Sequence, residues 1–186
     1  MKLLLHVCCA PCSVMCIETL RSEGVEPTLY WYNPNIHPFT EYRNRRDCLV
    51  SYAKNLALTL VMEDRYGLKD FIVEYPFADS GRCGFCYRLR LEKAACAAKE
   101  RGFDAFCTSL LISPYQDHEL LKKTALAAAE RYGVEFLYRD FRPFFQEGQA
   151  KARAAGCYMQ KYCGCIFSEE ERYCGPQRPA QTVSKR

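Results

Sequence analysis

The 186-residue sequence lacks an uninterrupted apolar run long enough to cross a bilayer. A membrane-spanning helix needs about 18 or more such residues, so none is expected. The opening MKLLLHVCCA also lacks the cleavage site of a secretory signal, because its apolar run breaks at His6. We therefore predict a cytoplasmic protein that does not engage membranes.

Two other absences bear on domain organisation. No internal repeat is visible, and residues 175–186 contain no apolar anchor. We predict that this tail is disordered and that residues 1–174 form one catalytic domain. A chain of this length buries a full core without disulfides, and its net charge of +4 is only mildly favourable for a polyanionic partner.

Cysteine, in contrast, is abundant, with thirteen residues. Thiols stay reduced in the cytosol, and an odd number cannot pair completely. A static disulfide framework is therefore not expected, and metal binding or thiol chemistry is favoured.

Short apolar segments alternate with longer helical ones. Strands are predicted at 2–7, 27–32, 59–63, 106–112 and 135–140, and helices at 11–22, 38–58, 83–102, 118–133 and 146–155. This order is typical of an α/β three-layer sandwich with a mostly parallel sheet. Ligands bind such folds beyond the carboxyl ends of the strands, which is where Cys8 and Cys9 are expected.

Three cysteine clusters lie at element boundaries, where side chains can converge: Cys8, Cys9 and Cys12; Cys83 and Cys86; Cys163 and Cys165. Adjacent strand residues point to opposite faces, so Cys8 and Cys9 share one centre only if the strand has ended. Cys83 and Cys86 lie at a helix start, whose positive end should lower thiol pKa values.

The other cysteines lack such placement, and free cysteine is among the most frequently buried residue types. We interpret them as structural or incidental: Cys16, Cys48, Cys96, Cys107, Cys157 and Cys174. The seven clustered cysteines exceed the four ligands of a zinc site or of a four-iron cluster. Spacing alone leaves both open, with the surplus thiols holding a second metal or cycling between dithiol and disulfide.

Five segments, HVCCAPCS, YWYNPNIHPFTEYRNR, RCGFCYRLRLEKAA, GFDAFCTSLLISPYQ and YCGC, follow one another along the chain. Together they resemble the epoxyqueuosine reductases of the QueH type. The resemblance implies a Rossmann-like fold akin to the adenine nucleotide alpha hydrolases. It also implies reduction of epoxyqueuosine to queuosine at the wobble position of tRNAs with GUN anticodons, the last step of queuosine biosynthesis, without cobalamin.

The resemblance further implies a 4Fe–4S cluster on four cysteines: Cys8, Cys9, Cys83 and Cys86. It implies that Cys163 and Cys165 form a redox-active disulfide or bind an iron next to the cluster, and Cys12 could complete that second site. Removing the epoxide oxygen takes two electrons, whereas one cluster passes them singly, so a second centre would give the extra cysteines a purpose. An external electron donor is required.

The segments EYRNRR and CYRLRLEK bring arginines and tyrosines near the expected site. Arginine binds phosphates, and aromatic rings stack on splayed bases. The predicted substrate contacts are Asn33, Asn35, Tyr42, Arg43, Tyr87 and Arg88. The proton donor is left open: His37 is expected to be accessible in its loop, whereas His6 is expected to be a satisfied core group.

Two alternatives are carried. A PP-loop tRNA thiolase would need a Ser-Gly-Gly-x-Asp-Ser phosphate loop after the first strand, but the sequence there is Cys-Cys-Ala-Pro-Cys-Ser, so ATP use is not expected. The other is a zinc-containing tRNA-binding module without catalysis, which would be colourless where an iron–sulfur protein is brown.

Overall fold

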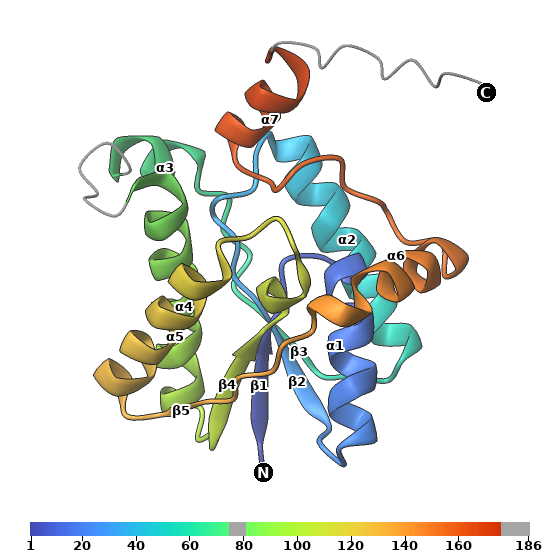
Figure 1. The fold of residues 1–186 in the computed structure, drawn as a ribbon, viewed down its shortest axis with the longest axis vertical. Helices are drawn as coiled ribbons and strands as arrows, with labels where there is room; N and C mark the ends of the chain where they lie inside the picture. Colours follow the sequence, from blue (N-terminus) through green and yellow to red (C-terminus); the bar gives the residue numbers. More distant parts are fainter. Residues whose placement is uncertain (75–80, 176–186) are drawn as a thin grey trace, which may run out of the picture.

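The computed structural model describes residues 1–74 and 81–175. Its strands form one parallel sheet in the order β3-β2-β1-β4-β5 (Figure 1). The strands are β1 (Leu3–His6), β2 (Pro27–Trp31), β3 (Leu60–Met62), β4 (Ala105–Thr108) and β5 (Glu135–Phe136). The predicted α/β class with a parallel sheet is confirmed, while the prediction of a disordered tail lies, for 176–186, outside the described residues.

Helices cover both faces of this sheet. They are α1 (Ala10–Ser22), α2 (Phe39–Asn55), α3 (Leu68–Glu74), α4 (Gly81–Glu100), α5 (His118–Tyr132), α6 (Phe145–Ala154) and α7 (Ile166–Tyr173), with 3-10 turns η2 (Ser109–Ile112) and η3 (Arg142–Phe144). Helices α4 and α5 pack together on one side, and α1 packs with α6 and α2 on the other (Figure 1). Within the described ranges, no helix is long and apolar enough to cross a membrane.

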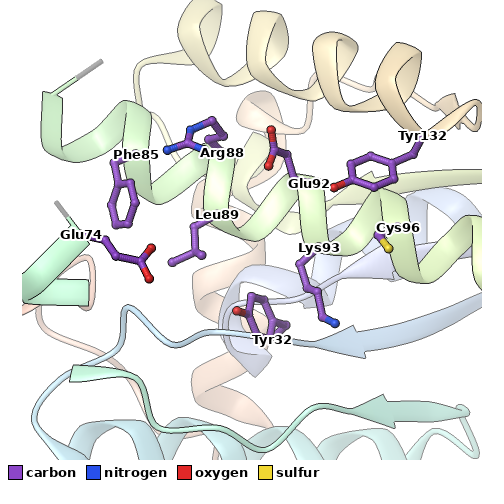
Figure 2. Close-up of a pocket in the computed structure, with 9 residues that line it drawn as sticks. All are labelled: Tyr32, Glu74, Phe85, Arg88, Leu89, Glu92, Lys93, Cys96 and Tyr132. Atoms are coloured by element: carbon purple, nitrogen blue, oxygen red, sulfur yellow. The ribbon is translucent and has the colours of Figure 1, made fainter. Parts of the chain in front are cut away.

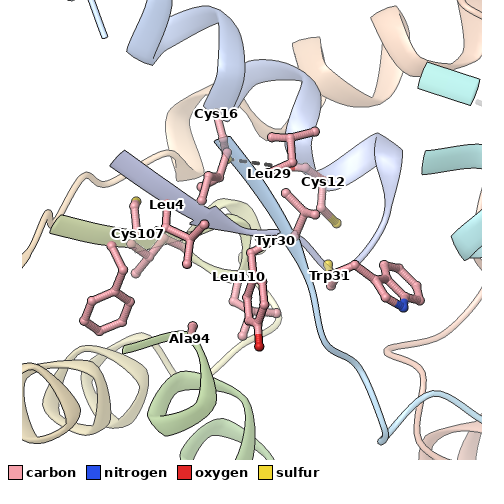
Figure 3. Packing of buried hydrophobic residues seen from close by; sticks show 14 of the residues in the cluster. Leu4, Cys12, Cys16, Leu29, Tyr30, Trp31, Ala94, Cys107 and Leu110 are labelled. Atoms are coloured by element: carbon pink, nitrogen blue, oxygen red, sulfur yellow. Dashed lines mark hydrogen bonds between the residues drawn. The ribbon is translucent and has the colours of Figure 1, made fainter. Parts of the chain in front are cut away.

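Strand β1 lies in the middle of the sheet and is covered on both faces. Leu3, Leu4 and Leu5 are at most 1% exposed, and Figure 3 shows Leu4 among side chains from neighbouring elements. A strand covered on both faces must be apolar at successive positions rather than alternating. Each buried leucine stabilises the fold by about 1.5–3 kcal/mol, so this run anchors the segment that precedes the first cysteines.

Two predicted strands end earlier than expected. The predicted strand 106–112 stops at Thr108, because the Thr108 hydroxyl accepts the Leu110 N–H and caps η2. The predicted strand 135–140 is reduced to two residues, because β4, with which it pairs, has turned away. Helices α3 and α7 were not predicted.

Helix α1 begins directly after the strand. Pro11 occupies its first turn, where a fixed φ is favourable, and Gly24 follows its end with φ +77°. Cys16 is fully buried, and its thiol donates to the carbonyl of Cys12 at 3.3 Å (Figure 3). The interpretation of Cys16 as a structural residue of this helix is confirmed.

The strand order reverses between β1 and β4, with β2 and β3 on one side and β5 on the other. Such a switch point opens a crevice beyond the carboxyl ends of the two central strands. Cys8 and Ser109 follow those two ends, so the fold brings the first cysteine cluster to its preferred ligand-binding position.

Candidate thiol-rich active site

Three thiols meet just beyond β1. The Sγ atoms of Cys8 and Cys9 are 3.8 Å apart, and those of Cys8, Cys9 and Cys12 all lie within 4.8 Å of one another. The strand ends at His6, which meets the condition under which Cys8 and Cys9 can share a centre. Within residues 1–74 and 81–175, no other group of three metal-ligating side chains is as close.

The three thiols of this buried triad differ in their pKa values. Thiol hydrogen bonds from Cys12 and Cys9 hold the pKa of Cys8 well below its usual value, and the nearby Arg90 and Arg45 guanidinium groups act in the same direction. The pKa values of Cys9 and Cys12 are raised. The hydrogen bonds of the other two thiols therefore favour the ionised form of Cys8.

Residues from distant parts of the chain contact the triad. Ser109 accepts the backbone N–H of Cys8 at 3.2 Å and directs its hydroxyl toward the Cys8 Sγ at 3.7 Å. Gln160 donates from Nε2 to the Cys12 Sγ at 3.4 Å. The triad thus contacts residues that follow β4 and residues of the carboxyl-terminal segment.

The remaining clustered cysteines form a second neighbourhood. Cys86 and Cys165 are buried in a small apolar cluster with Phe71 and Phe85, whereas the side chains of Cys83 and Cys163 are exposed. Burial raises the pKa of Cys86 to about 12. The expectation of a lowered pKa at Cys86 is wrong, because desolvation outweighs the helix terminus.

Arg90 links the two neighbourhoods. This arginine is 2% exposed, and its Nε donates to the carbonyl of Cys86 at 3.3 Å. Burial alone would lower the pKa of Arg90, but Cys86, Cys163 and Cys8 raise it. Among the described residues, neither its Nη2 nor the Oε1 of Gln160, both buried, has a hydrogen-bond partner. The unpaired Arg90 donor, beside soft sulfur ligands, fits an anionic metal–sulfur group at this end of the sheet.

A second buried arginine fastens the loop that carries Cys163. Arg45 is 1% exposed and forms an ion pair with Glu41 at 2.6 Å. Its Nη1 and Nη2 each donate at 2.9 Å, to the carbonyls of Cys163 and Tyr162 respectively. The guanidinium therefore holds the backbone of the Cys-Gly-Cys loop directly.

Gly164 completes the fit of this loop. Its φ is +140°, and a Cβ there would lie 3.1 Å from Arg45 Nη1 and 3.3 Å from Ile36 Cγ1. A residue with a side chain would be strained in this conformation and would push against the arginine. Glycine between the two cysteines is therefore required by both backbone and packing.

His37 joins the same loop from the other side. Its backbone N–H donates to the Gly164 carbonyl at 2.7 Å, its Nε2 donates to the Pro34 carbonyl, and its Nδ1 accepts the Ile166 N–H at 3.2 Å. The ring is fully buried. The expectation of an accessible His37 is wrong, because the loop folds inward to hold the Cys-Gly-Cys segment.

Acidification is expected to destabilise the protein through His37. Burial lowers its folded-state pKa to about 4, whereas an unfolded histidine titrates near 6.5. Between these values only the unfolded chain gains the proton, so stability falls as pH falls, by at most about 3 kcal/mol from this group. The free energy of unfolding, measured with urea from pH 7 to 4, should fall less steeply with pH in His37→Gln than in the wild type, because glutamine does not titrate. The same pH dependence of unfolding free energy in the variant and the wild type would contradict a role for His37.

His6 is a satisfied core residue, as expected. Its Nε2 donates to the Tyr32 carbonyl at 3.3 Å, and its Nδ1 accepts from the Thr108 hydroxyl at 2.9 Å. Burial, followed by the nearby Arg90 charge, lowers the pKa of His6 to about 4. The ring is therefore neutral at pH 7 and ties the ends of the two central strands together.

Most of the predicted substrate contacts are internal. Four of the six have buried side chains: Asn33, Asn35, Tyr42 and Tyr87. Asn33 donates to the Val7 carbonyl, and the Tyr42 hydroxyl donates to Asp64. Arg43 and Arg88 are exposed. In this arrangement only these two reach solvent, and contact by the other four stays a prediction.

Arg88 lines a hollow of about 220 Å³ between α4, α5 and the end of β2 (Figure 2). The wall includes Tyr32, Glu74, Lys93 and Tyr132. Positions 85, 88, 89, 92 and 93 of α4 form this wall, whereas Cys83, Cys86 and Arg90 occupy another face of the helix. The hollow therefore lies on a different face of α4 from Cys83, Cys86 and Arg90, and Cys96 is the cysteine that lines it.

Sequence reasoning missed several residues that border the thiols: Arg45, Arg90, Ser109, Gln116 and Gln160. Arg90 lies four positions after Cys86 and seven after Cys83, and this helical spacing places the three on one face. That signal was available. Gln116 and Gln160 lie in loops, where no periodicity marks their direction.

The layers, the strand order and the buried thiols at the switch point define the class of protein: a cysteine-rich α/β three-layer sandwich with a parallel sheet. A solved structure described as a predicted subunit of tRNA methyltransferase from Methanocaldococcus jannaschii aligns with TM-score 0.50 and 15% identity. The alignment covers 82% of this chain and 76% of that one. This likeness concerns the fold alone.

The family model for Epoxyqueuosine reductase QueH matches residues 3–171. A relative of that name from Dehalococcoides mccartyi is 36% identical over 96% of this chain and 98% of its own. Another from Thermotoga maritima is 35% identical, with 91% of each chain covered. The chain belongs to the epoxyqueuosine reductase QueH family, which confirms the predicted family and its oxidoreductase class.

Proposed function

We propose that this protein reduces epoxyqueuosine to queuosine at the wobble position of tRNAs with GUN anticodons, without cobalamin, as the last step of queuosine biosynthesis. One observation carries the proposal. A member of this family places three buried thiols, within 4.8 Å of one another, at the switch point of a parallel sheet. The phosphate loop of nucleotide-binding relatives would lie there, so sulfur chemistry replaces phosphate binding.

The thiols would hold the cofactor in two parts. A 4Fe–4S cluster is proposed on Cys8, Cys9, Cys83 and Cys86, and a further iron, or a dithiol–disulfide pair, on Cys163 and Cys165 with Cys12. Such groups supply single electrons and, at a free metal site, Lewis acidity. The lowered pKa of Cys8 and the Arg90 Nη2, which has no hydrogen-bond partner among the described residues, support this assignment.

The protein's own side chains would hold this centre in place. Arg90 and Arg45 offset the negative charge of the thiolates, since both guanidinium groups are buried beside them. Gln116 donates to the Cys163 Sγ at 3.4 Å, and the Tyr87 hydroxyl donates to Gln116 at 2.6 Å. The contact with the Cys163 sulfur is therefore backed by a second hydrogen bond, from Tyr87 to Gln116.

The partners in this proposal are the modified tRNA and an external electron donor, both met in the cytoplasm. Arg43 and Arg88 are the predicted contacts with exposed side chains, and we assign them to phosphates. The other four, Asn33, Asn35, Tyr42 and Tyr87, would contact substrate only if the segments around them open.

Anaerobic turnover tests the function directly. Protein prepared without oxygen is mixed with epoxyqueuosine-containing tRNA and a chemical reductant, and the nucleosides are analysed by mass spectrometry. Queuosine, lighter by one oxygen atom, is expected to appear and to require both protein and reductant. Unchanged epoxyqueuosine in the presence of iron-loaded protein would contradict the proposal.

A further inference from the structure

Tyr115 is the most exposed large apolar side chain among the described residues, at 84%. A single surface aromatic is ordinary and needs no explanation. Tyr115 differs because the next residue, Gln116, donates to the Cys163 Sγ. The exposed ring therefore stands at the rim of the thiol site.

The segment that presents this ring is held in place. The Tyr115 N–H donates to the Ser113 hydroxyl at 3.3 Å, and the Gln116 N–H donates to the Ser113 carbonyl at 3.4 Å. The Asp117 N–H donates to the Tyr87 hydroxyl, and the Asp117 carboxylate caps α5. Because this loop is already ordered, a ligand that binds to its exposed aromatic ring costs the loop little conformational entropy.

A second ring supports the first. Phe145, at the start of α6, meets Tyr115 edge-on with ring centroids 5.8 Å apart. Gly148 approaches Met15, and Lys151 pairs with Glu18, so the start of α6 lies toward the first turn of α1. That turn carries Cys12. The aromatic pair thus lies next in sequence to the residue that contacts Cys163, and toward the helix turn that carries Cys12.

Resting on the proposed function, we propose that Tyr115, braced by Phe145, is the stacking platform for an unpaired anticodon-loop base next to the modified nucleoside. Any of the four bases of a single-stranded loop can stack on an aromatic side chain. A platform beside the sulfur site would hold the loop open while the modified nucleoside enters. Neither residue was among the contacts expected from the sequence.

Binding of an anticodon stem-loop that carries epoxyqueuosine tests this inference. Tyr115→Ala should weaken affinity by roughly five- to hundredfold, the usual effect of removing one stacked base, whereas Tyr115→Phe should keep it. Leu126→Ala is the matched control, because Leu126 is an exposed apolar residue of α5, 49% exposed. The slope of log affinity against log salt should not change, since the ring carries no charge.

Equal affinity of Tyr115→Ala and wild type, with wild type still converting the tRNA, would overturn the platform and leave the proposed function intact. Wild type that neither binds nor converts this RNA would overturn both. A third outcome concerns the electron donor. If Tyr115→Ala keeps its RNA affinity and its turnover with a chemical reductant but loses turnover with a protein electron donor, the ring serves donor docking and the inference is overturned. A reduced salt slope would overturn it as well, because it would show lost phosphate contacts.

Discussion

Cys8→Ser is expected to lose bound iron and to slow epoxyqueuosine reduction by more than about a hundredfold. Cys8 is the member of the triad whose pKa is lowered, by thiol hydrogen bonds from Cys12 and Cys9 and by the charges of Arg90 and Arg45. A serine hydroxyl is a poor ligand for soft metals. Because loss of an outer partner of a metal ligand already costs 10–100-fold, loss of the ligand should cost more. Iron per chain, visible absorption and turnover are the measurements.

Cys96→Ser is the matched control for this experiment. Cys96 lies on another face of α4 and donates to Glu100, so iron and rate should stay at wild-type values. A Cys8→Ser protein with wild-type iron and wild-type rate would refute the site. The same assay on Cys163→Ser separates the two versions of the second centre, because full retention of iron would exclude an iron bound by Cys163.

Arg45→Met is expected to lower the free energy of unfolding by about 3–5 kcal/mol, the usual loss when one member of a buried ion pair is removed. Glu41 would keep a buried, unpaired charge, and the carbonyls of Tyr162 and Cys163 would lose their donor. For a chain of this size the midpoint of thermal unfolding should fall by roughly 6–20 °C. Calorimetry of the metal-free protein measures both.

The double variant Glu41→Gln with Arg45→Met keeps this prediction testable if the single variant does not fold. Neutral side chains at both positions should recover most of the lost free energy of unfolding, because no unpaired charge remains buried. Arg21→Met provides a surface comparison: its ion pair with the exposed Glu26 should contribute about 1 kcal/mol or less. Equal losses at Arg21 and Arg45 would contradict the role of burial.

The amino-terminal half of the site could be predicted from sequence, and the reason is local. The apolar run before Cys8 and the proline after it fix a strand end and a helix start, so the triad's position follows from neighbouring residues. The carboxyl-terminal half could not be predicted in this way. Gln160 approaches Cys12, and Arg45 reaches Cys163, through tertiary contacts that leave no periodic pattern in the sequence.

The same distinction explains the errors in the fold and the site. His37 lies in a polar, turn-rich stretch that is typical of a surface loop, but its backbone hydrogen bond to Gly164 holds it inside the fold. Strand β5 is short because β4 turns at Thr108 through a side-chain cap. Local composition indicates the type of an element, whereas its length and burial depend on its neighbours.

The contact between Cys12 and Gln160 joins positions 148 residues apart, which has a consequence for biosynthesis. At about 5–20 residues per second, the ribosome makes the first three thiols roughly 7–30 s before the segment that covers them. A nascent chain therefore carries an incomplete sulfur centre throughout most of its synthesis. Of the proposed ligands, Cys163 and Cys165 are made last, so the proposed centre can be completed only after this segment has been synthesised.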